Sequence, residues 1–260
     1  MSFGEHLVTV NALTIVVAFL LVLYAYGKRK INTSALIGTL TLGAVLLVAF
    51  GLEFGYAGLL VLLAFFIFGN VVTKYKYEQK AMLGVAEGNK GMRDINNVLG
   101  NGLSPLIFAV VYAFSRDTIF LLGFSGAVAT ACSDTFSTEI GQATGNPRLI
   151  TTLKKVPVGT NGGVSLTGLG AALLGSALIS LVSLVFIAPS IHFGAQWHPG
   201  AFFFLVCLTA GFFGCLVDSL FGATLEDTRL YTFSVNKHGV NILATFSGGI
   251  FAILLGSFLT

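Results

Sequence analysis

Eight long apolar runs divide the chain and constrain its fold more than any other feature. They cover residues 7–26, 33–51, 55–73, 98–114, 118–140, 165–188, 200–224 and 239–259. Most of them approach the roughly 20 residues that a helix needs to cross the hydrocarbon core of a bilayer. Because backbone polar groups find no water in lipid, we expect each run to be helical. The fourth run is short and contains Pro105, so a broken helix with seven full spans is the alternative.

The scarcity of charge indicates the same class of protein. Charged residues make up 10% of the chain, against roughly 25% in a soluble domain. So few charges cannot cover a surface that faces water. We therefore predict an all-α fold, a polytopic membrane helix bundle that forms one integral-membrane domain over residues 1–260. We expect membrane lipids around it and no nucleic-acid partner.

The basic residues predict how the bundle is oriented. Lys28-Arg29-Lys30 follows the first run instead of preceding it, so we expect a retained helix and no secretory signal. If this cluster is cytoplasmic, the inside loops hold thirteen of the fourteen basic residues, and only Arg116 falls outside. The thirteen are Lys28, Arg29, Lys30, Lys74, Lys76, Lys80, Lys90, Arg93, Arg148, Lys154, Lys155, Arg229 and Lys237. This sorting predicts eight spans, both termini outside, an interfacial Trp197, and cytoplasmic loops at 74–97, 141–164 and 225–238.

Carboxylates inside the apolar runs are candidates for function. Asp134 and Glu139 lie in the fifth run, Asp218 lies in the seventh, and Glu226 follows it at the membrane edge. An ionised side chain in lipid costs several kcal/mol, about 2.5–3.5 by insertion scales, unless it is paired, hydrated or functional. Each aspartate shares a helical face with small residues: Gly126, Thr130 and Thr138, and Gly211, Gly214 and Gly222. Such stripes also favour close helix packing, and Glu226 and Asp227 also fit an ordinary solvated helix end.

The two aspartates also suggest an internal repeat of parallel hairpins. Cys132-Ser-Asp134 and Cys215-Leu-Val-Asp218 are each followed by a loop and a new span. Those spans open with Gly163-Val-Ser165 and Gly239-Val-Asn241. Repeated units are common in membrane folds, and short apolar strings also match by chance.

A glycine-rich loop before the sixth span resembles a phosphate cradle. Lys154 and Lys155 precede Gly159, Thr160, Asn161, Gly162, Gly163 and Ser165. Glycine lets backbone N–H groups face an anion, and the N-terminus of a following helix adds a favourable dipole. The lysines precede the glycines, so this is not the P-loop of nucleotide-binding proteins. Taken alone, the loop fits a flexible turn equally well.

The predicted topology brings these residues to one membrane face together with four asparagines. Asn97 and Asn101 open the fourth span, and Asn236 and Asn241 open the eighth, where they can cap helices or contact a ligand. Carboxylates, amides and a glycine–lysine loop are the parts of a magnesium–phosphate site. A phosphorylated substrate with an apolar tail could place its head at this face and its tail in the bilayer.

Five strings resemble an integral-membrane family, long of unknown function, that includes the phytyl-phosphate kinase of plant chloroplasts. They are Asn97-Val-Leu-Gly-Asn101-Gly, Ser133-Asp134-Thr-Phe-Ser-Thr-Glu139-Ile-Gly, Val156-Pro-Val-Gly-Thr-Asn-Gly-Gly-Val-Ser165, Asp218-Ser-Leu-Phe-Gly-Ala-Thr-Leu-Glu226, and Asn236 with Val240-Asn241. The chain departs from the family pattern at Glu226, where glutamine is expected, and at Lys237-His238-Gly239.

The resemblance implies an Mg²⁺-dependent kinase that transfers a phosphoryl group from a nucleoside triphosphate to an isoprenyl monophosphate. CTP is the expected donor. It assigns Asp134, Glu139, Asp218 and Glu226 to metal or phosphate binding, and the Lys154–Ser165 loop to the phosphate cradle. Such an acceptor is already anionic, so positioning and charge neutralisation suffice. Two alternatives are a nucleotidyltransferase that forms a CDP-lipid and an ion-coupled transporter. The transporter is less favoured, because carrier sites lie near mid-membrane and these carboxylates approach the cytoplasmic ends.

Overall fold

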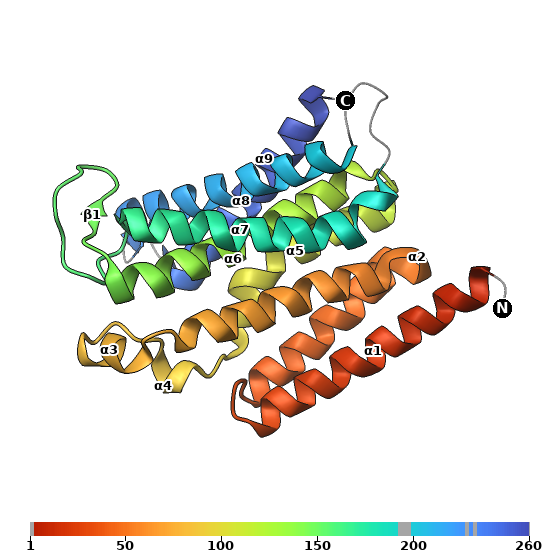
Figure 1. Cartoon of the computed structure of the whole chain (residues 1–260), viewed down its shortest axis with the longest axis horizontal. Coiled ribbons are helices and arrows are strands. Elements are labelled where there is room, and N and C mark those ends of the chain that lie inside the picture. The colour runs from red at the N-terminus through yellow and green to blue at the C-terminus, as the bar shows by residue number, and fades with distance from the viewer. Residues whose placement is uncertain (1–2, 192–198, 227–228, 231–232, 260) are drawn as a thin grey trace.

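The computed structural model describes residues 3–191, 199–226, 229–230 and 233–259, and helices dominate these ranges (Figure 1). In chain order the elements are α1 (Phe3–Gly27), α2 (Thr33–Lys74), α3 (Tyr77–Met82), α4 (Gly88–Gly91), α5 (Ile95–Ser115), α6 (Ile119–Thr144), β1 (Arg148–Leu149), β2 (Gly163–Val164), α7 (Leu166–Phe186), η1 (Ala188–Ser190), α8 (Pro199–Thr224), β3 (Arg229–Leu230), β4 (Phe233–Ser234) and α9 (Lys237–Leu259). Trp197 and Asp227 lie outside the described residues.

The eight predicted spans are confirmed. Among the described residues, eight helical segments are long and apolar enough to cross a membrane. Two of them, Thr33–Gly51 and Gly55–Lys74, are the halves of α2, which folds back on itself at Gly51. Gly51 has φ 66°, a backbone conformation that glycine adopts without a steric cost. The seven-span alternative is wrong, because α5 continues through Pro105 as one helix.

The helices differ sharply in how much of their surface is buried. The span in α6 is 78% buried, whereas the span in α1 is 11% buried. Small residues allow the close packing around α6: a Cβ on Gly126 would come within 2.7 Å of Ala252 in α9. Likewise, a Cβ on Gly175 of α7 would meet the Cys132 carbonyl oxygen at 2.7 Å. The core therefore forms around α6, and α1 lies at the periphery against α2 (Figure 1).

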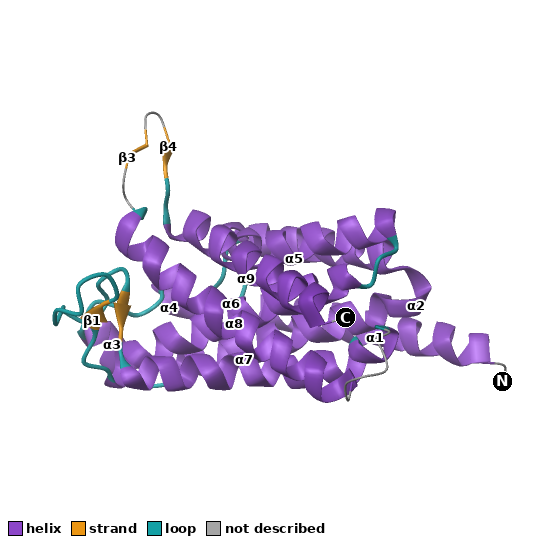
Figure 2. Cartoon of the chain, turned by 90° about the horizontal axis from the view of Figure 1, so that it is seen from above, coloured by secondary structure: helices purple, strands orange, loops and turns teal. Residues whose placement is uncertain are grey.

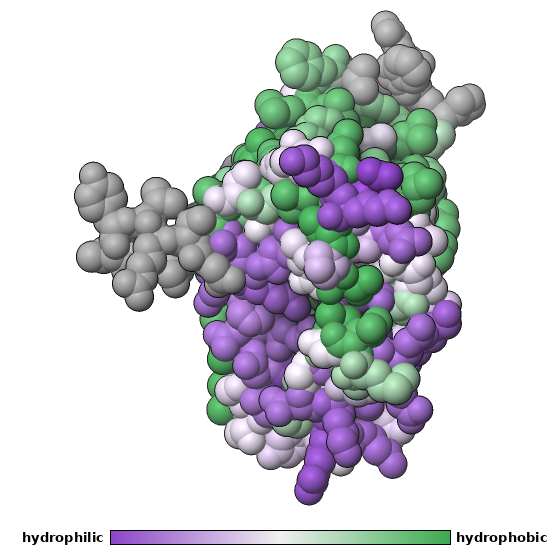
Figure 3. Space-filling model, turned by 90° about the vertical axis from the view of Figure 1, so that its left-hand side faces the viewer, coloured by the Kyte–Doolittle hydropathy of each residue, from purple (hydrophilic) through white to green (hydrophobic). Residues whose placement is uncertain are grey.

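The loops with the basic residues gather at one end of the bundle. The backbone N–H of Asn32 donates to the Arg93 carbonyl at 3.0 Å, which joins the loop before α2 to the loop before α5. Figure 1 places α3, α4 and β1 at this same end, and Figure 3 shows hydrophilic residues over much of it. Arg116 follows the opposite end of α5. The predicted sorting of charges between two faces therefore agrees with the fold, and which face is cytoplasmic stays a prediction.

Two helix–hairpin–helix units follow one another in the second half of the chain. Between α6 and α7, β1 pairs with β2 in antiparallel register, with Arg148 opposite Val164. Between α8 and α9, β3 pairs with β4 in the same sense, with Arg229 opposite Ser234 (Figure 2). This shared order of elements agrees with the hypothesis of a hairpin repeat. The loop at 74–97 contains one short helix, α3, and a single turn, α4.

Candidate functional site

The packing of α6 against α8 brings Asp134 and Asp218 together. Both helices run towards the polar end, and a Cβ on Gly214 would collide with the side chain of Thr130. Residues four apart lie on the same face of a helix. One turn after this contact, the carboxyl groups of Asp134 and Asp218 face each other. The two small-residue stripes are thus packing surfaces, and the same packing forms the aspartate pair.

The aspartate pair leaves one oxygen without a partner. Thr138 lies beside Asp134, one helical turn further along α6. The Oδ2 atom of Asp218 is enclosed and has no hydrogen-bond partner among the described residues. Two facing carboxylates repel unless a proton or a cation lies between them. Asp218 lies six residues before the end of α8, about 9 Å along the helix. The pair therefore offers acidic oxygens to a cation just below the polar end.

Glu139 has a different partner, a lysine that sequence reasoning did not single out. The Lys80 ammonium group forms a short ion pair with Glu139, and the two residues are 0% and 4% exposed. The same ammonium group donates to the Thr73 carbonyl at 3.0 Å. Because Glu139 has this dedicated partner, it is a weaker candidate for a metal ligand than either aspartate. Lys80 lies in a loop rich in lysines, and nothing in the sequence distinguishes it from them.

The glycine loop lies directly on α8 beside Asp218. Gly162 has φ +73°, and a Cβ on it would meet Ala223 and come within 2.6 Å of the Ser219 carbonyl oxygen. The Gly163 N–H, which we expected to bind phosphate, donates to the Thr160 carbonyl at 2.9 Å. Packing therefore explains the glycine at 162, and one N–H of the predicted cradle already has a protein partner.

The other predicted residues of this loop have local roles or face solvent. The Ser165 hydroxyl caps α7 by accepting the Gly168 N–H at 3.1 Å. Asn161 lies beside α8, where its carbonyl carbon is 3.8 Å from a Cβ built on Gly222. Lys154 and Lys155 are exposed. The structure therefore places the loop beside the aspartate pair and does not bring its lysines into contact with it.

The predicted asparagines divide between helix caps and buried contacts. Asn236 accepts the Gly239 N–H at 3.0 Å at the start of α9. Asn97 completes a capping box with Asp94 at the start of α5, and Asn101 donates to the Asn97 carbonyl at 3.1 Å. Capping was one of the two roles expected for these residues. The fourth asparagine, at 241, is 9% exposed, and its carbonyl accepts a hydrogen bond from Thr245 at 2.7 Å.

A cluster around Glu87 supplies positive charge next to the aspartate pair. The Lys237 ammonium group lies 3.1 Å from Glu87, and the Arg93 guanidinium group lies 3.7 Å from it. Burial alone would raise the pKa of Glu87, but the positive charges of Lys237 and Arg93 outweigh it and lower that pKa. Lys237 also interacts electrostatically with both aspartates. Sequence reasoning missed Lys237 as a site residue, although it immediately precedes the last apolar run.

The four carboxylates predicted to bind metal do not form one cluster. Among the side chains that the structure describes, no group of three or more His, Cys, Asp or Glu residues could hold a metal ion. Asp134 and Asp218 form a pair, Glu226 acts electrostatically on Asp218, and Glu139 contacts Lys80. Mg²⁺ commonly binds one or two carboxylates and takes its other ligands from substrate phosphates and water. The aspartate pair, with its enclosed free oxygen, fits that mode of binding.

Comparisons with known proteins give one family and several relatives. The integral membrane protein family DUF92 matches residues 16–249. The uncharacterized membrane protein MJ0933 of Methanocaldococcus jannaschii is 34% identical over 93% of this chain and 92% of its own length. The chloroplastic protein VTE6 of Arabidopsis thaliana is 34% identical over 96% of this chain and 71% of its own. The uncharacterized membrane protein sll0875 of Synechocystis is 34% identical over 91% of this chain and 87% of its own. No solved structure matches the chain.

Proposed function

This chain belongs to the integral membrane protein family DUF92, and from that premise we propose that it is a membrane-bound isoprenyl-phosphate kinase. Its substrates are an isoprenyl monophosphate and a nucleoside triphosphate, with CTP as the first candidate donor. The resemblance of its motifs to the family of the chloroplast phytyl-phosphate kinase supports this reaction. The 34% identity to a chloroplastic plant protein over 96% of this chain shows that the relationship extends well beyond these motifs.

The observation that carries the proposal is the aspartate pair with its enclosed, unpartnered oxygen. Asp134 and Asp218 meet at the polar end of an otherwise apolar bundle, and the Oδ2 atom of Asp218 lacks a partner among the described residues. A carboxylate pair at that depth requires a cation or a function. Bound there, Mg²⁺ would neutralise charge on the phosphates of the nucleotide. We assign Asp134 and Asp218 as its ligands.

The reaction breaks one phosphorus–oxygen bond and forms another. An anionic oxygen of the isoprenyl monophosphate attacks the terminal phosphorus of the nucleoside triphosphate. The bond between that phosphorus and its bridging oxygen breaks, the nucleoside diphosphate leaves, and the acceptor becomes an isoprenyl diphosphate. Because the attacking oxygen of a phosphate monoester is already largely deprotonated near neutral pH, no general base is needed. Positioning and charge neutralisation supply the catalysis.

The residues of the chain have separable tasks in this reaction. Lys237 interacts with both aspartates and also contacts Glu87, so its ammonium group can turn to a phosphate oxygen. The loop around Gly162 covers α8 immediately after Asp218 and restricts the space above the pair. These groups orient the donor and exclude water from the transferring phosphoryl group.

A direct test uses the purified full-length protein in lipid nanodiscs. CTP, ATP, GTP and UTP are each supplied with Mg²⁺ and with dimethylallyl, geranyl, geranylgeranyl or phytyl phosphate, and products are resolved by mass spectrometry. We expect an isoprenyl diphosphate together with one nucleoside diphosphate. Release of pyrophosphate with a nucleotidyl-lipid product would replace the kinase with a nucleotidyltransferase. Absence of any nucleotide-dependent product would reject both enzymes and revive the transporter.

A further inference from the structure

A cavity of about 300 Å³ lies among α1, α2 and α5 and reaches α6 at Thr135, the residue after Asp134. Its wall is mostly apolar and includes Phe19 of α1, Leu62 and Phe66 of the second half of α2, and Leu40 of the first half. The lining residues of the second half run from 59 to 70, which corresponds to about 16 Å along the helix axis. The cavity is therefore narrow, and its length is about half the roughly 30 Å of the hydrocarbon core.

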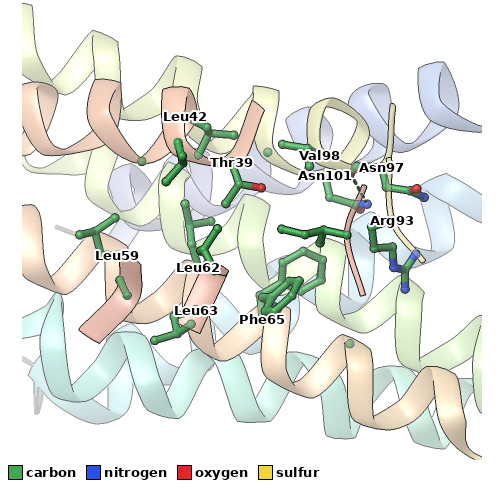
Figure 4. A pocket seen from close by; sticks show the side chains of 18 of the residues that line it. Thr39, Leu42, Leu59, Leu62, Leu63, Phe65, Arg93, Asn97, Val98 and Asn101 are labelled. Carbon is green, nitrogen blue, oxygen red and sulfur yellow. Dashed lines mark hydrogen bonds between the residues drawn. The ribbon is translucent and has the colours of Figure 1, made fainter. Parts of the chain in front are cut away.

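One end of this cavity is polar. Arg93, Asn97 and Asn101 lie together at that end, and leucine side chains line the other (Figure 4). The Arg93 guanidinium group donates to the Thr73 hydroxyl at 3.0 Å and lies 3.7 Å from Glu87. A guanidinium group has five N–H donors and binds phosphate oxygens well. An apolar cavity with one arginine and two amides at its mouth complements a molecule with an anionic head and a hydrocarbon tail.

The cavity lies between α1, at the periphery of the bundle, and α6, the helix that carries Asp134. Phe19 belongs to α1, the least buried span, so α1 is the wall that separates the cavity from lipid. Thr135, which follows Asp134 directly on α6, also lines the cavity. At the mouth, Glu87 contacts Arg93, and Lys237 connects Glu87 to the aspartates. Glu87 alone thus separates a head group bound to Arg93 from Lys237, whose charge acts on both aspartates.

We propose that this cavity holds the tail of the lipid acceptor, so that the tail lies inside the protein and not in the surrounding bilayer. The acceptor is a single-chain isoprenyl monophosphate whose phosphate binds Arg93 and Asn97, and this identity rests on the proposed kinase function. A single unbranched or methyl-branched chain suits a cavity of this volume, whereas a phospholipid with two acyl chains does not. The cavity therefore selects an acceptor with a single hydrocarbon chain and holds its phosphate beside the donor site.

Two glycines in the cavity wall allow the tail site to be filled without disturbing the core. A Cβ on Gly43 would lie 3.6 Å from Leu59, and a Cβ on Gly69 would lie 3.8 Å from Thr135, so a Cβ fits at each position in ordinary van der Waals contact with a residue of the cavity wall. Gly43→Leu and Gly69→Leu extend a leucine towards the cavity. Gly170→Leu is the matched control, because Gly170 lies in the α7 span with no atom within 4 Å of its Cβ position. All three changes exchange glycine for the same residue within a helix.

The first experiment measures binding without nucleotide, so that its outcome does not depend on phosphoryl transfer. Equilibrium binding of geranylgeranyl phosphate is compared with that of dimethylallyl phosphate in nanodiscs. Gly43→Leu and Gly69→Leu should each weaken the binding of geranylgeranyl phosphate about tenfold or more. Displacing two methylene groups of the tail from the cavity is enough for a loss of that size. Dimethylallyl phosphate should bind almost unchanged, and Gly170→Leu should leave both affinities unaltered. Equal affinities in all four proteins would overturn the proposal, as would equal losses for both ligands.

The second experiment locates the tail. Geranylgeranyl phosphate with a diazirine at its terminal isoprene unit is crosslinked by light, and the modified residues are mapped. Labels should concentrate on Leu59, Leu62 and Leu63, which line the end of the cavity away from Arg93, and excess geranylgeranyl phosphate should compete them away. Excess phosphatidic acid should not, because two acyl chains do not enter. Labels spread over exposed α7 residues such as Leu173 and Leu181 would place the tail in bulk lipid, and competition by phosphatidic acid would show that the cavity does not select a single chain. Either result would overturn the proposal. If labels map to the cavity but no phosphoryl transfer is found, the kinase fails and the lipid-phosphate site stands.

Discussion

Asp134 and Glu139 lie five residues apart on α6, but the structure surrounds them with opposite kinds of partner. Glu139 contacts Lys80, a fully buried lysine whose ammonium group is also bonded to the Thr73 carbonyl. Asp134 faces a second carboxylate, Asp218, which retains an unpartnered oxygen. The positive charge of Lys237 acts on both aspartates, but the Lys237 side chain is 51% exposed and already contacts Glu87. The fold thus neutralises Glu139, whereas the Asp134–Asp218 pair is available to a cation from outside the chain.

The difference suggests which carboxylates serve folding and which serve chemistry. Removing one partner of a buried ion pair destabilises the fold strongly, because the remaining charge is then buried without compensation. A pair of like charges opposes folding unless a proton or cation joins them, so its presence requires another reason. We therefore expect substitutions at the two places to separate activity from stability.

The largest expected effect is on activity, at the aspartate pair. Asp134→Asn and Asp218→Asn each remove one ligand and one negative charge without changing side-chain size. Turnover should fall by at least about a hundredfold, the scale for losing a group that stabilises transferring charge. Thermal stability without nucleotide should stay the same or rise, because the like-charge contact is gone. Steady-state turnover and thermal unfolding of the same preparations measure both. Near-normal turnover in either variant would remove that aspartate from the mechanism.

The next effect is on stability, at Lys80 and Glu139. Lys80→Met and Glu139→Gln each leave the other group without its charged partner, at a cost of about 3–5 kcal/mol in the free energy of unfolding. The double variant Lys80→Met with Glu139→Met buries no lone charge and should recover most of the loss. Chemical denaturation in mild detergent compares the four proteins.

The double variant also provides the decisive control for the comparison. It should transfer phosphate at close to the wild-type rate at a temperature where it is folded. If its stability is restored while turnover is lost, Glu139 has a role in catalysis, as the family resemblance implies. The separation between a structural and a catalytic carboxylate on α6 would then be wrong.

A smaller effect distinguishes the lysines. Lys237 interacts with both aspartates, whereas Lys155 is exposed in the loop between β1 and β2. Lys237→Ala should raise the apparent dissociation constant for the nucleotide about tenfold, the lower end for losing one charge-assisted hydrogen bond. Lys155→Ala should change it less. Titration of CTP onto both variants tests this order, and a larger loss at Lys155 would favour the phosphate cradle as the sequence predicted it.

The membrane spans and the candidate aspartates could be predicted from the sequence, because local patterns indicate both. Hydrophobic length predicted each membrane helix, including α5, where proline made the prediction uncertain. The stripes through Asp134 and Asp218 showed that each aspartate lies on a face of small residues. Their contact required a further fact, namely that α6 and α8 are neighbours in parallel, which no local pattern contains.

Other features depend on the fold alone. Lys80 is one of several lysines in its loop, and only the placement of α3 across the end of α6 buries it against Glu139. Gly162 was expected to approach a phosphate, but it approaches the backbone of α8, so Gly162→Val would displace the loop whether or not a nucleotide binds there. The cavity lies among the first spans, which resemble the family in apolar character only. The residue types at these positions are common, so their roles depend on where the fold places them.

The smallest expected effect concerns Glu87, the carboxylate that forms an ion pair with Lys237. Lys237 and Arg93 lower the pKa of Glu87 below its ordinary value of 4.5 even though burial opposes this. A lowered pKa in the folded state means that the ionised form stabilises the fold above the ordinary value. That contribution is lost as the pH falls through the lowered pKa. Glu87→Gln should therefore lower the thermal midpoint slightly at neutral pH, by the equivalent of about 0.2–1 kcal/mol for a solvent-screened pair. The difference from wild type should vanish in acid. A difference that grew as the pH fell would show that Glu87 is held by something other than its two cations.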